Sequence, residues 1–455
     1  MGRRKKRLIG NPPRQRPPVV DSAPRVLKRW MMIVLACVGF LIYGHSLHAP
    51  FILDDVHKIE MNPDLRVERW PEMFSRLVYP YAETYTFDRN DPSRPVTFLT
   101  YTLNYYFGKL NPFGYRLVNL MGHIGVSLLL FLLSLRIFSL VFEKEQTFLA
   151  FFVSLLFLVH PVNASVALYA FNRSDILVGL FTLGALLLFF RSGPQDRLRR
   201  WGSLGLFVLA LGSKQSAVVF PPLLLAADVL LGQETRRERF RSRARLHIPF
   251  WIVLGLYLVA RVWYFGQWGD LEAESPIDAG VYRISQLYSI VRYLQMIFVP
   301  IGMSLDHMPK LFSSIFDPVI LACGSVLTVG AVWVYRQMRK DTFGSRMKVF
   351  AVVWFVLQLA PTSSFFPTTA IFADNRLYLS MIGILFLIAL GYLALFHTDG
   401  LGRVHAIPVL SIGEWSKGLH GTYELPSADI ICSSSESTSS GDSRVSATTR
   451  RTRSR

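Results

Sequence analysis

Two adjacent aspartates, Asp54 and Asp55, follow the first long apolar segment of the chain, and His57 lies just beyond them. A positioned carboxylate can take the proton from a hydroxyl group, so the pair is a candidate for a general base. Adjacent side chains cannot point the same way on a helix or a strand, so we expect the two carboxylates to have different partners, with His57 in support. We favour Asp54 as the base and Asp55 as its support. The alternative is that both aspartates only cap the next turn.

Basic residues recur near the ends of later apolar segments, where an anionic ligand would need them. Lys214 stands in a short Gly-Ser turn with no acidic neighbour in sequence, and Arg261 and Arg376 lie at or near the same predicted membrane face. Such cations form charge-assisted hydrogen bonds to phosphate, so these three are candidates for binding a lipid phosphate. Arg292 and Lys310 lie near the same face. The alternative for each arginine is that it only extends to the membrane surface.

The chain shows no metal-ligand spacing. Its three cysteines are scattered, and His123 and His160 stand alone within or beside apolar segments. These histidines could bind a metal ion or transfer protons, or they could form interhelical hydrogen bonds. We favour the interhelical hydrogen bonds. There is also no glycine-rich phosphate loop and no serine nucleophile motif. The sequence therefore predicts no certain cofactor and leaves a divalent metal ion as an option.

The composition places these residues in a membrane protein. Of 455 residues, 51% are apolar and only 18% are charged, whereas a soluble domain is about 25% charged. The net charge of +18 is concentrated in clusters, with ten Lys or Arg in residues 1–30 and six Arg in residues 236–245. Because each cluster adjoins an apolar segment, we interpret it as a cytoplasmic anchor rather than a nucleic-acid site. Membrane lipid is therefore an expected partner, and nucleic acid is not.

Ten apolar segments are predicted to cross the membrane, for which a helix needs about 20 residues. They are residues 31–48, 117–142, 148–159, 176–190, 201–211, 218–231, 248–265, 316–335, 349–360 and 379–396. The first is interpreted as a retained helix, because no small-residue cleavage site follows it. Basic connections at 191–200, 235–245 and 335–348 predict that both chain ends are cytoplasmic. If residues 285–301 also crossed, the basic connection at 335–348 would lie outside the cytoplasm. We therefore predict that residues 285–301 form an interfacial or re-entrant helix on the non-cytoplasmic side.

The predicted fold class is an all-α polytopic membrane protein whose unusual residues gather on the non-cytoplasmic face. Residues 1–30 form a basic cytoplasmic tail and residues 31–396 the transmembrane domain, in which residues 49–115 are the first outer loop. Within that loop, residues 93–108 have the spacing of an amphipathic helix at the membrane interface. Residues 397–455 have the composition of a disordered Ser- and Arg-rich tail. The alternative is that this segment results from a shifted reading frame or a truncation.

Seven motifs in a fixed order carry a family resemblance. They are FILDDVHKIEMNPDL, SRPVTFLTYTLNYYFG, NLMGHIGVSLLLF, LLFLVHPVNASVALYAFNRSDILVGLF, LGSKQSAVVFPPLLLAADVLL, YLQMIFVPIGMSLDH and FADNRLYLSMIG. This order resembles the membrane half of the transmembrane-and-TPR O-mannosyltransferases and their bacterial relatives. Those proteins are GT-C glycosyltransferases, which move a sugar from a polyprenyl-phosphate carrier to an acceptor on the lumenal or periplasmic face. The resemblance covers about residues 49–395 and implies a GT-C-like fold.

The resemblance also implies roles for single residues. It makes one of Asp54 and Asp55 the base on the acceptor hydroxyl, and it places Lys214 and Arg376 at the lipid phosphate. Supporting residues in motif cores, with no role assigned, are Arg94, His160, Arg173, Asp175 and Asp306. The chain departs from the family pattern where Gln215 replaces an acidic residue after the lysine, and where the string DNR replaces a Glu-Arg pair. It also lacks helical repeats with a 34-residue period.

The predicted function is that of an integral-membrane hexosyltransferase. Its expected partners are a polyprenyl-phosphate-linked sugar, mannose by resemblance to the eukaryotic members, and a protein or glycan hydroxyl. Its expected location is the endoplasmic reticulum or the bacterial inner membrane. The rival interpretation is a transporter or flippase of an anionic lipid or solute, which should show paired halves with charges near the midplane. Here the ionisable residues gather at one face, which favours the enzyme over the transporter. An inactive scaffold is a third interpretation.

Overall fold

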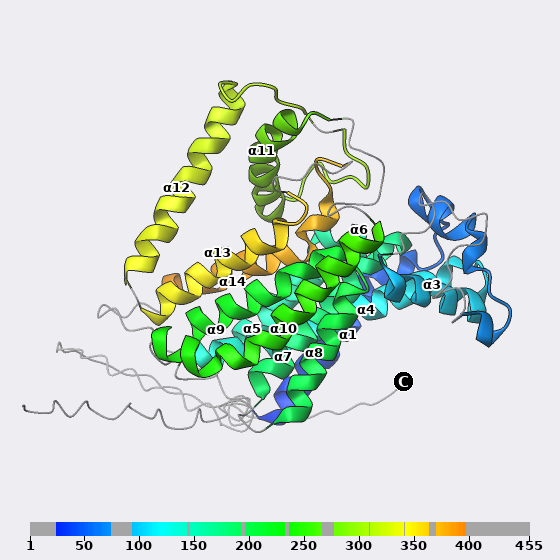
Figure 1. Ribbon diagram of the computed structural model, residues 1–455, viewed down its shortest axis with the longest axis horizontal. Helices are drawn as coiled ribbons and strands as arrows, with labels where there is room; N and C mark the ends of the chain where they lie inside the picture. Colours follow the sequence, from blue (N-terminus) through cyan, green and yellow to red (C-terminus); the bar gives the residue numbers. More distant parts are fainter. Residues whose placement is uncertain are drawn as a thin grey trace, which may run out of the picture. The chain divides into compact units, whose positions relative to one another are not determined.

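The computed structural model describes residues 24–73, 93–142, 146–192, 196–232, 236–265, 277–308, 310–340, 342–363 and 370–396. Within these ranges all of the regular structure is helical, which confirms the all-α prediction (Figure 1). The α-helices are α1 (Arg25–Tyr43), α3 (Pro95–Gly108), α4 (Pro112–Val141), α5 (Thr147–Val159), α6 (Ala164–Leu168), α7 (Arg173–Arg191), α8 (Arg197–Leu211), α9 (Phe220–Leu231), α10 (Arg236–Phe265), α11 (Ala279–Phe298), α12 (Pro318–Lys340), α13 (Phe343–Leu359) and α14 (Leu377–Phe396). Short helical turns that bear on the site are η1 (Gly44–Ser46), η2 (Val56–Glu60), η4 (Pro161–Asn163), η5 (Ala170–Asn172), η6 (Gln215–Val219) and η7 (Asp374–Arg376).

Capping residues set where several helices begin. The Asn111 side chain accepts a hydrogen bond from the backbone N–H of Phe113, and Pro112 fills the first position of α4, where an N–H would have no helical partner. Asp278 accepts from two backbone N–H groups at the start of α11, and Thr342 caps α13 in the same way. Such polar residues before apolar segments are visible in the sequence, so the predicted segments and the helices largely coincide.

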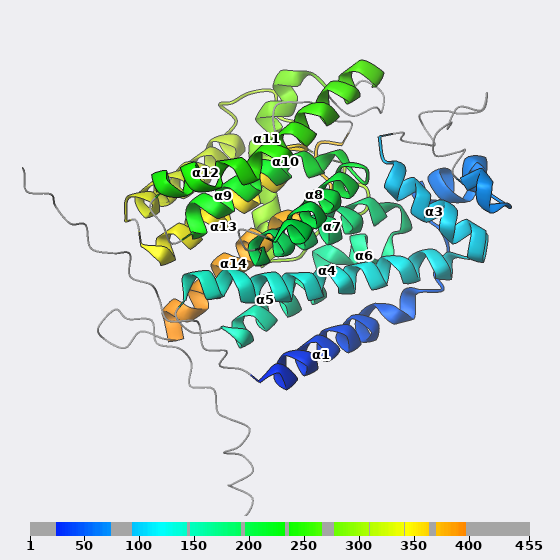
Figure 2. The same ribbon diagram turned by 60° about the horizontal axis from the view of Figure 1, so that its bottom comes forward.

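Helices α4, α5, α7, α13 and α14 contribute much of the buried core, and α1 lies along α4 and α5 (Figure 2). A glycine sets the closest approach of α13 and α14. A Cβ atom at Gly383 would lie only 2.2 Å from the carbonyl oxygen of Ala351. Small residues allow this close packing between helices in lipid, where the hydrophobic effect gives little drive for helices to associate.

Six of the described helices are long and apolar enough to cross a membrane, or seven if α5 and the bent continuation through η4 and α6 count as one span. Each of the ten segments predicted to cross is helical, but α8, α9 and α13 have only 15, 12 and 17 residues. At about 1.5 Å per residue these three are shorter than a hydrocarbon layer of about 30 Å. The structure therefore supports a multi-pass membrane protein with about six spans, and the ten-crossing topology stays a prediction.

The predicted interfacial segment 285–301 lies mostly in α11, which ends at Phe298 before Pro300. Its interfacial or re-entrant placement stays a prediction, as does that of residues 93–108, which correspond to α3. The chain divides into two units, residues 1–406 and 407–455, and every described residue belongs to the first. The predicted C-terminal tail, most of the N-terminal tail and residues 74–92 of the first outer loop lie outside the described residues.

Candidate functional site

In the loop that follows α1, Asp54 is exposed and its main chain is held in place. The backbone N–H of Asp54 donates a hydrogen bond to the Tyr169 hydroxyl at 2.6 Å. Leu53, just before it, has a φ of 46°, a left-handed conformation that few residues other than glycine adopt. Burial and the nearby Asp54 charge raise the pKa of Tyr169, so its hydroxyl keeps its proton. The turn is thus held against Tyr169, and the Asp54 residue remains exposed.

The neighbouring Asp55 is fully buried and has different partners. Its carboxylate accepts backbone N–H bonds from Phe171 at 2.8 Å and Ala170 at 3.4 Å. The Arg116 guanidinium lies 4.0 Å from this carboxylate and also donates to three backbone carbonyls of adjoining segments. Burial raises the pKa of Asp55 to about 6, although the Phe171 bond and Arg116 oppose the shift. Asp55 therefore fastens the loop that follows α1 to the chain that leads into α7.

Arg173 is buried at the start of α7 and is engaged within the protein. Its guanidinium donates to the Asn119 side chain at 2.8 Å and to the Tyr115 carbonyl at 2.9 Å. It also donates to the Thr100 carbonyl at 3.1 Å and lies over the Tyr101 ring, 4.7 Å from its centroid. These partners come from α3 and α4. Arg173 therefore joins three helices, and its geometry is that of a structural residue.

Lys214 forms a close ion pair with Asp175. The ammonium nitrogen lies 2.7 Å and 2.8 Å from the two carboxylate oxygens, and the Asn375 side chain donates to the same carboxylate at 3.1 Å. Beside this pair, Arg94 donates to the Gln215 side chain at 3.2 Å. The family pattern places an acidic residue directly after the lysine. Here Asp175, 39 residues earlier in the chain, supplies the acidic partner.

Arg376 and Arg261, the other two candidates for phosphate contact, have different surroundings. The Arg376 guanidinium donates to the carbonyls of Thr362 at 2.7 Å and Ile371 at 3.0 Å, and to that of Ala370. It therefore shapes the chain that leads into η7. Arg261 is buried within α10. The hydrogen bonds described above for Arg376 and for Lys214 do not join the two residues.

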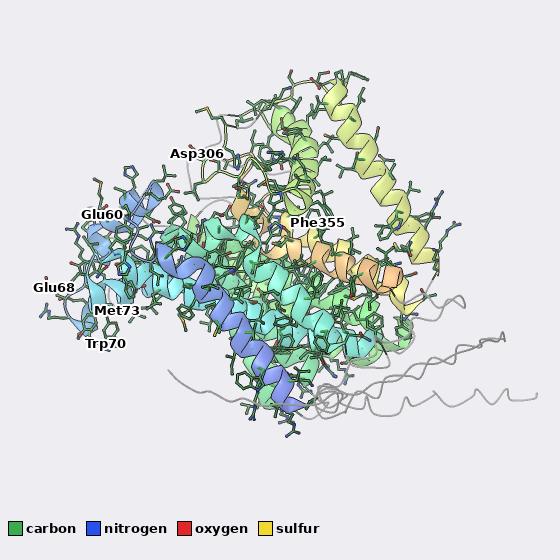
Figure 3. The ribbon with its side chains drawn as sticks, turned by 180° about the vertical axis from the view of Figure 1, so that it is seen from behind. Glu60, Glu68, Trp70, Met73, Asp306 and Phe355 are labelled. Atoms are coloured by element: carbon green, nitrogen blue, oxygen red, sulfur yellow. The ribbon has the colours of Figure 1, made fainter. Side chains whose placement is uncertain are left out.

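The remaining predicted residues lie at the surface or between helices. His57 and Asp306 are exposed, and Asp306, labelled in Figure 3, lies on the chain between α11 and α12. His160 donates from Nε2 to the Ile297 carbonyl at 3.0 Å and accepts from the Val162 N–H at 3.3 Å. His160 thus makes the kind of interhelical bond that we favoured over metal binding. Among the described residues, no group of three or more His, Cys, Asp or Glu side chains could hold a metal ion.

Residues 169–175 bring the candidate groups together. This segment holds the Asp54 main chain through Tyr169 at its start and Lys214 through Asp175 near its end. Six residues of tightly wound chain span roughly 9–12 Å at about 1.5–2.0 Å per residue. The exposed carboxylate and the Lys214 ion pair therefore lie along one short stretch of chain. Such a spacing suits a ligand with a neutral part and an anionic part.

Sequence reasoning missed several residues near this segment. They are Tyr169, Asn172, His307, Asp374 and Asn375. All of them lie inside the seven motifs listed above, and this membership is the sequence feature that could have indicated them. Their partners are distant in sequence, since Asn375 contacts Asp175 across 200 residues. Spacing along the chain cannot show pairs of this kind, so motif membership alone did not separate them from their neighbours.

Comparison with known proteins tests the family resemblance. The chain is 26% identical over 452 residues to "Protein O-mannosyl-transferase Tmtc3" of Drosophila melanogaster, covering 83% of this chain and 47% of that protein. It is 24% identical over 441 residues to "Protein O-mannosyl-transferase TMTC4" of Mus musculus, covering 83% of this chain and 58% of that protein. The predicted resemblance is confirmed.

A shorter stretch is more similar. Over 166 residues, 36% of this chain and 18% of the relative, the chain is 33% identical to "Protein O-mannosyl-transferase TMTC1" of Homo sapiens. The chain spans about half the length of the longer-matching curated relatives, 47% in the fly protein and 58% in the mouse protein. No protein-family model and no solved structure matches the chain.

Proposed function

We propose that the protein is an integral-membrane glycosyltransferase. It moves mannose from a polyprenyl-phosphate carrier to a hydroxyl group of a protein or glycan on the lumenal or periplasmic face. The names of its relatives support the sugar and a protein acceptor, and the apolar helices support the membrane location. The observation that carries the chemistry is the exposed Asp54, whose main chain is held by a 2.6 Å hydrogen bond to Tyr169.

In this mechanism Asp54 is the general base. Its carboxylate takes the proton of the acceptor hydroxyl while the hydroxyl oxygen attacks the anomeric carbon. The bond from that carbon to the phosphate oxygen breaks, and its electron pair leaves with the lipid phosphate. This leaving group is already a stable anion, so the site needs a base and cationic contacts more than a strong acid. A positioned base of this kind contributes about 10²–10⁴-fold to the rate.

Lys214 is the proposed cationic contact for the donor phosphate. An ammonium group has three N–H donors, so its contact with both oxygens of Asp175 leaves donor capacity for a ligand. Asp175 also fixes the position of the ammonium group before the donor binds. Arg376 contributes by shaping the chain before η7, and Arg261 is proposed as a further cation for the donor.

The proposed topology has ten crossings with both chain ends in the cytoplasm. Residues 31–396 form the GT-C-like domain, and the basic connections between helices carry this orientation because arginine and lysine concentrate on the cytoplasmic side. The tails at 1–30 and 397–455 are then cytoplasmic as well. The membrane is that of the endoplasmic reticulum or the bacterial inner membrane, and in both the acceptor is on the side opposite the cytoplasm.

Sugar transfer by the purified chain in lipid nanodiscs tests the proposal. The assay uses radiolabelled polyprenyl-phosphate mannose and a mixture of secreted proteins that lack mannose, and mass spectrometry locates the added hexose. We expect transfer from the lipid donor and none from a nucleotide-linked mannose. Absence of transfer from the lipid donor, with the chain folded, would contradict the proposal. Movement of the labelled lipid across a bilayer without transfer would instead support the flippase interpretation.

A further inference from the structure

A histidine and a carboxylate form a second polar pair close to the Lys214 site. Nε2 of His307 lies 2.6 Å from one oxygen of Asp374, and the other oxygen accepts from the Ser304 N–H at 3.0 Å. An ionised carboxylate only accepts hydrogen bonds, so the imidazole donates through its Nε2–H. Among the described residues, none is hydrogen-bonded to Nδ1 of His307. That nitrogen is therefore available to a ligand.

Aromatic packing fixes the orientation of this imidazole. The His307 ring meets the Phe372 ring edge-on with centroids 4.7 Å apart, and Phe372 stacks on Tyr293 at 4.4 Å. The Tyr293 hydroxyl accepts from the Ala373 N–H at 3.1 Å, which joins α11 to the chain before η7. A donor held in this way loses little side-chain entropy when it binds a ligand.

The pair adjoins the proposed phosphate site through η7. Asp374 is followed directly by Asn375, whose side chain donates to Asp175 at 3.1 Å. Consecutive Cα atoms are about 3.8 Å apart, so Asp374 and Asn375 keep the two polar groups close to each other. Asp374 contacts His307, and Asn375 contacts the Asp175 carboxylate that pairs with Lys214. A phosphate bound at Lys214 would therefore have the His307 imidazole near it as a further hydrogen-bond donor.

The segment that carries His307 also exposes apolar side chains. They are Met303, Leu305, Met308 and Leu311, and the Met308 side chain is almost fully exposed. Clusters of exposed apolar residues mark contact with lipid or with another protein. A polar donor flanked by such residues matches the chemistry of a lipid with an anionic head and an apolar tail.

We propose that His307 binds the phosphate of a prenyl-phosphate lipid through Nδ1–H, with the isoprenoid chain against Met303, Leu305, Met308 and Leu311. This inference rests on the proposed function, which supplies the lipid phosphate. A phosphate oxygen only accepts hydrogen bonds, so this contact uses an N–H at Nδ1 beside the Nε2–H that Asp374 accepts. The Asp374 carboxylate then balances the added positive charge and keeps the ring in place.

Binding of a short-chain prenyl phosphate to the purified chain in nanodiscs tests this inference without any sugar transfer. The matching prenyl alcohol reports the apolar contacts alone. We expect His307→Gln to weaken phosphate binding about ten- to a hundred-fold, as for loss of a hydrogen bond to a charged group, and to leave alcohol binding unchanged. The exposed His45 of η1 provides the matched control variant His45→Gln. Equal losses for both lipids, or no loss for either, would overturn the proposal.

A measurement on the unaltered chain covers a variant that fails to fold. Modification of His307 by diethyl pyrocarbonate, mapped by mass spectrometry, should slow when prenyl phosphate is added and should not respond to the alcohol. Equal protection by both lipids, or by neither, contradicts the inference. If the wild type binds prenyl phosphate through His307 but transfers no sugar, only the proposed function fails. If it transfers sugar and His307→Gln binds phosphate normally, only this inference fails.

Discussion

Burial of Asp55 should make the stability of the protein depend on pH. Burial raises the pKa of this carboxyl from 3.8 to about 6. A difference of about 2 pKa units at about 1.36 kcal/mol per unit corresponds to about 3 kcal/mol. The folded chain binds this proton more tightly than the unfolded chain does. The contribution to the free energy of unfolding is therefore present below about pH 4 and is lost as the pH rises through about 6.

The assay is reversible unfolding in nanodiscs at a series of pH values for the wild type and for Asp55→Asn. The variant has no titrating group at this position. The difference in free energy of unfolding between wild type and variant should therefore fall by about 2.4 kcal/mol from pH 4 to pH 7, because part of the total is already lost at pH 4. Asp54→Asn, which removes the exposed neighbouring carboxylate, is the matched control and should largely keep the wild-type profile. Parallel profiles for the wild type and Asp55→Asn would refute the reasoning that burial of this carboxylate dominates its environment.

Three further predictions test the packing around the site. Lys214→Met and Asp175→Asn should each lower the free energy of unfolding by about 3 kcal/mol, because each leaves a largely buried charge unpaired. The double variant should lose at least about 1 kcal/mol less than the sum of the two single losses. Additive losses, measured by unfolding, would contradict a stabilising ion pair. Arg173→Met should cost about 4 kcal/mol in the same assay, since it leaves several buried acceptors without a donor, and a loss below about 1 kcal/mol would contradict its structural role. Tyr169→Phe should cost about 1 kcal/mol and slow sugar transfer several-fold, because the main chain of Asp54 loses its hydrogen-bond acceptor; unchanged transfer kinetics would separate Tyr169 from the base.

The helices could be predicted from the sequence because their signals are local. Apolar segments, capping residues such as Asn111 and Asp278, and breaks such as Pro300 all act within one or two turns. The number of crossings is a different matter. Helices of 12 and 15 residues, α9 and α8, have the composition of a membrane segment without its length. Hydropathy alone therefore favours more crossings than helix length supports.

The site was predicted only in part, because its contacts are long-range. The sequence marks Lys214 as unusual, but it cannot show that Asp175 lies within 2.8 Å of it. It also cannot distinguish Arg173, which donates hydrogen bonds to groups within the protein, from an arginine that faces a ligand. The distinction between Asp54 and Asp55 follows the same logic. Adjacency predicts that the two side chains diverge, and only the fold shows that Asp55 is the buried one.

Sugar transfer by Asp54→Asn tests the central claim most directly. The measurement is the rate from labelled polyprenyl-phosphate mannose at saturating donor, with donor binding and unfolding measured on the same sample. Glu60→Gln, which alters an exposed acid of the same loop (Figure 3), is the matched control. If Asp54 is the base, the rate should be about 10²–10⁴-fold lower for Asp54→Asn, with donor binding and stability unchanged. A rate within about threefold of the wild type would contradict the assignment of Asp54 as the base, since it falls far short of what loss of a general base costs.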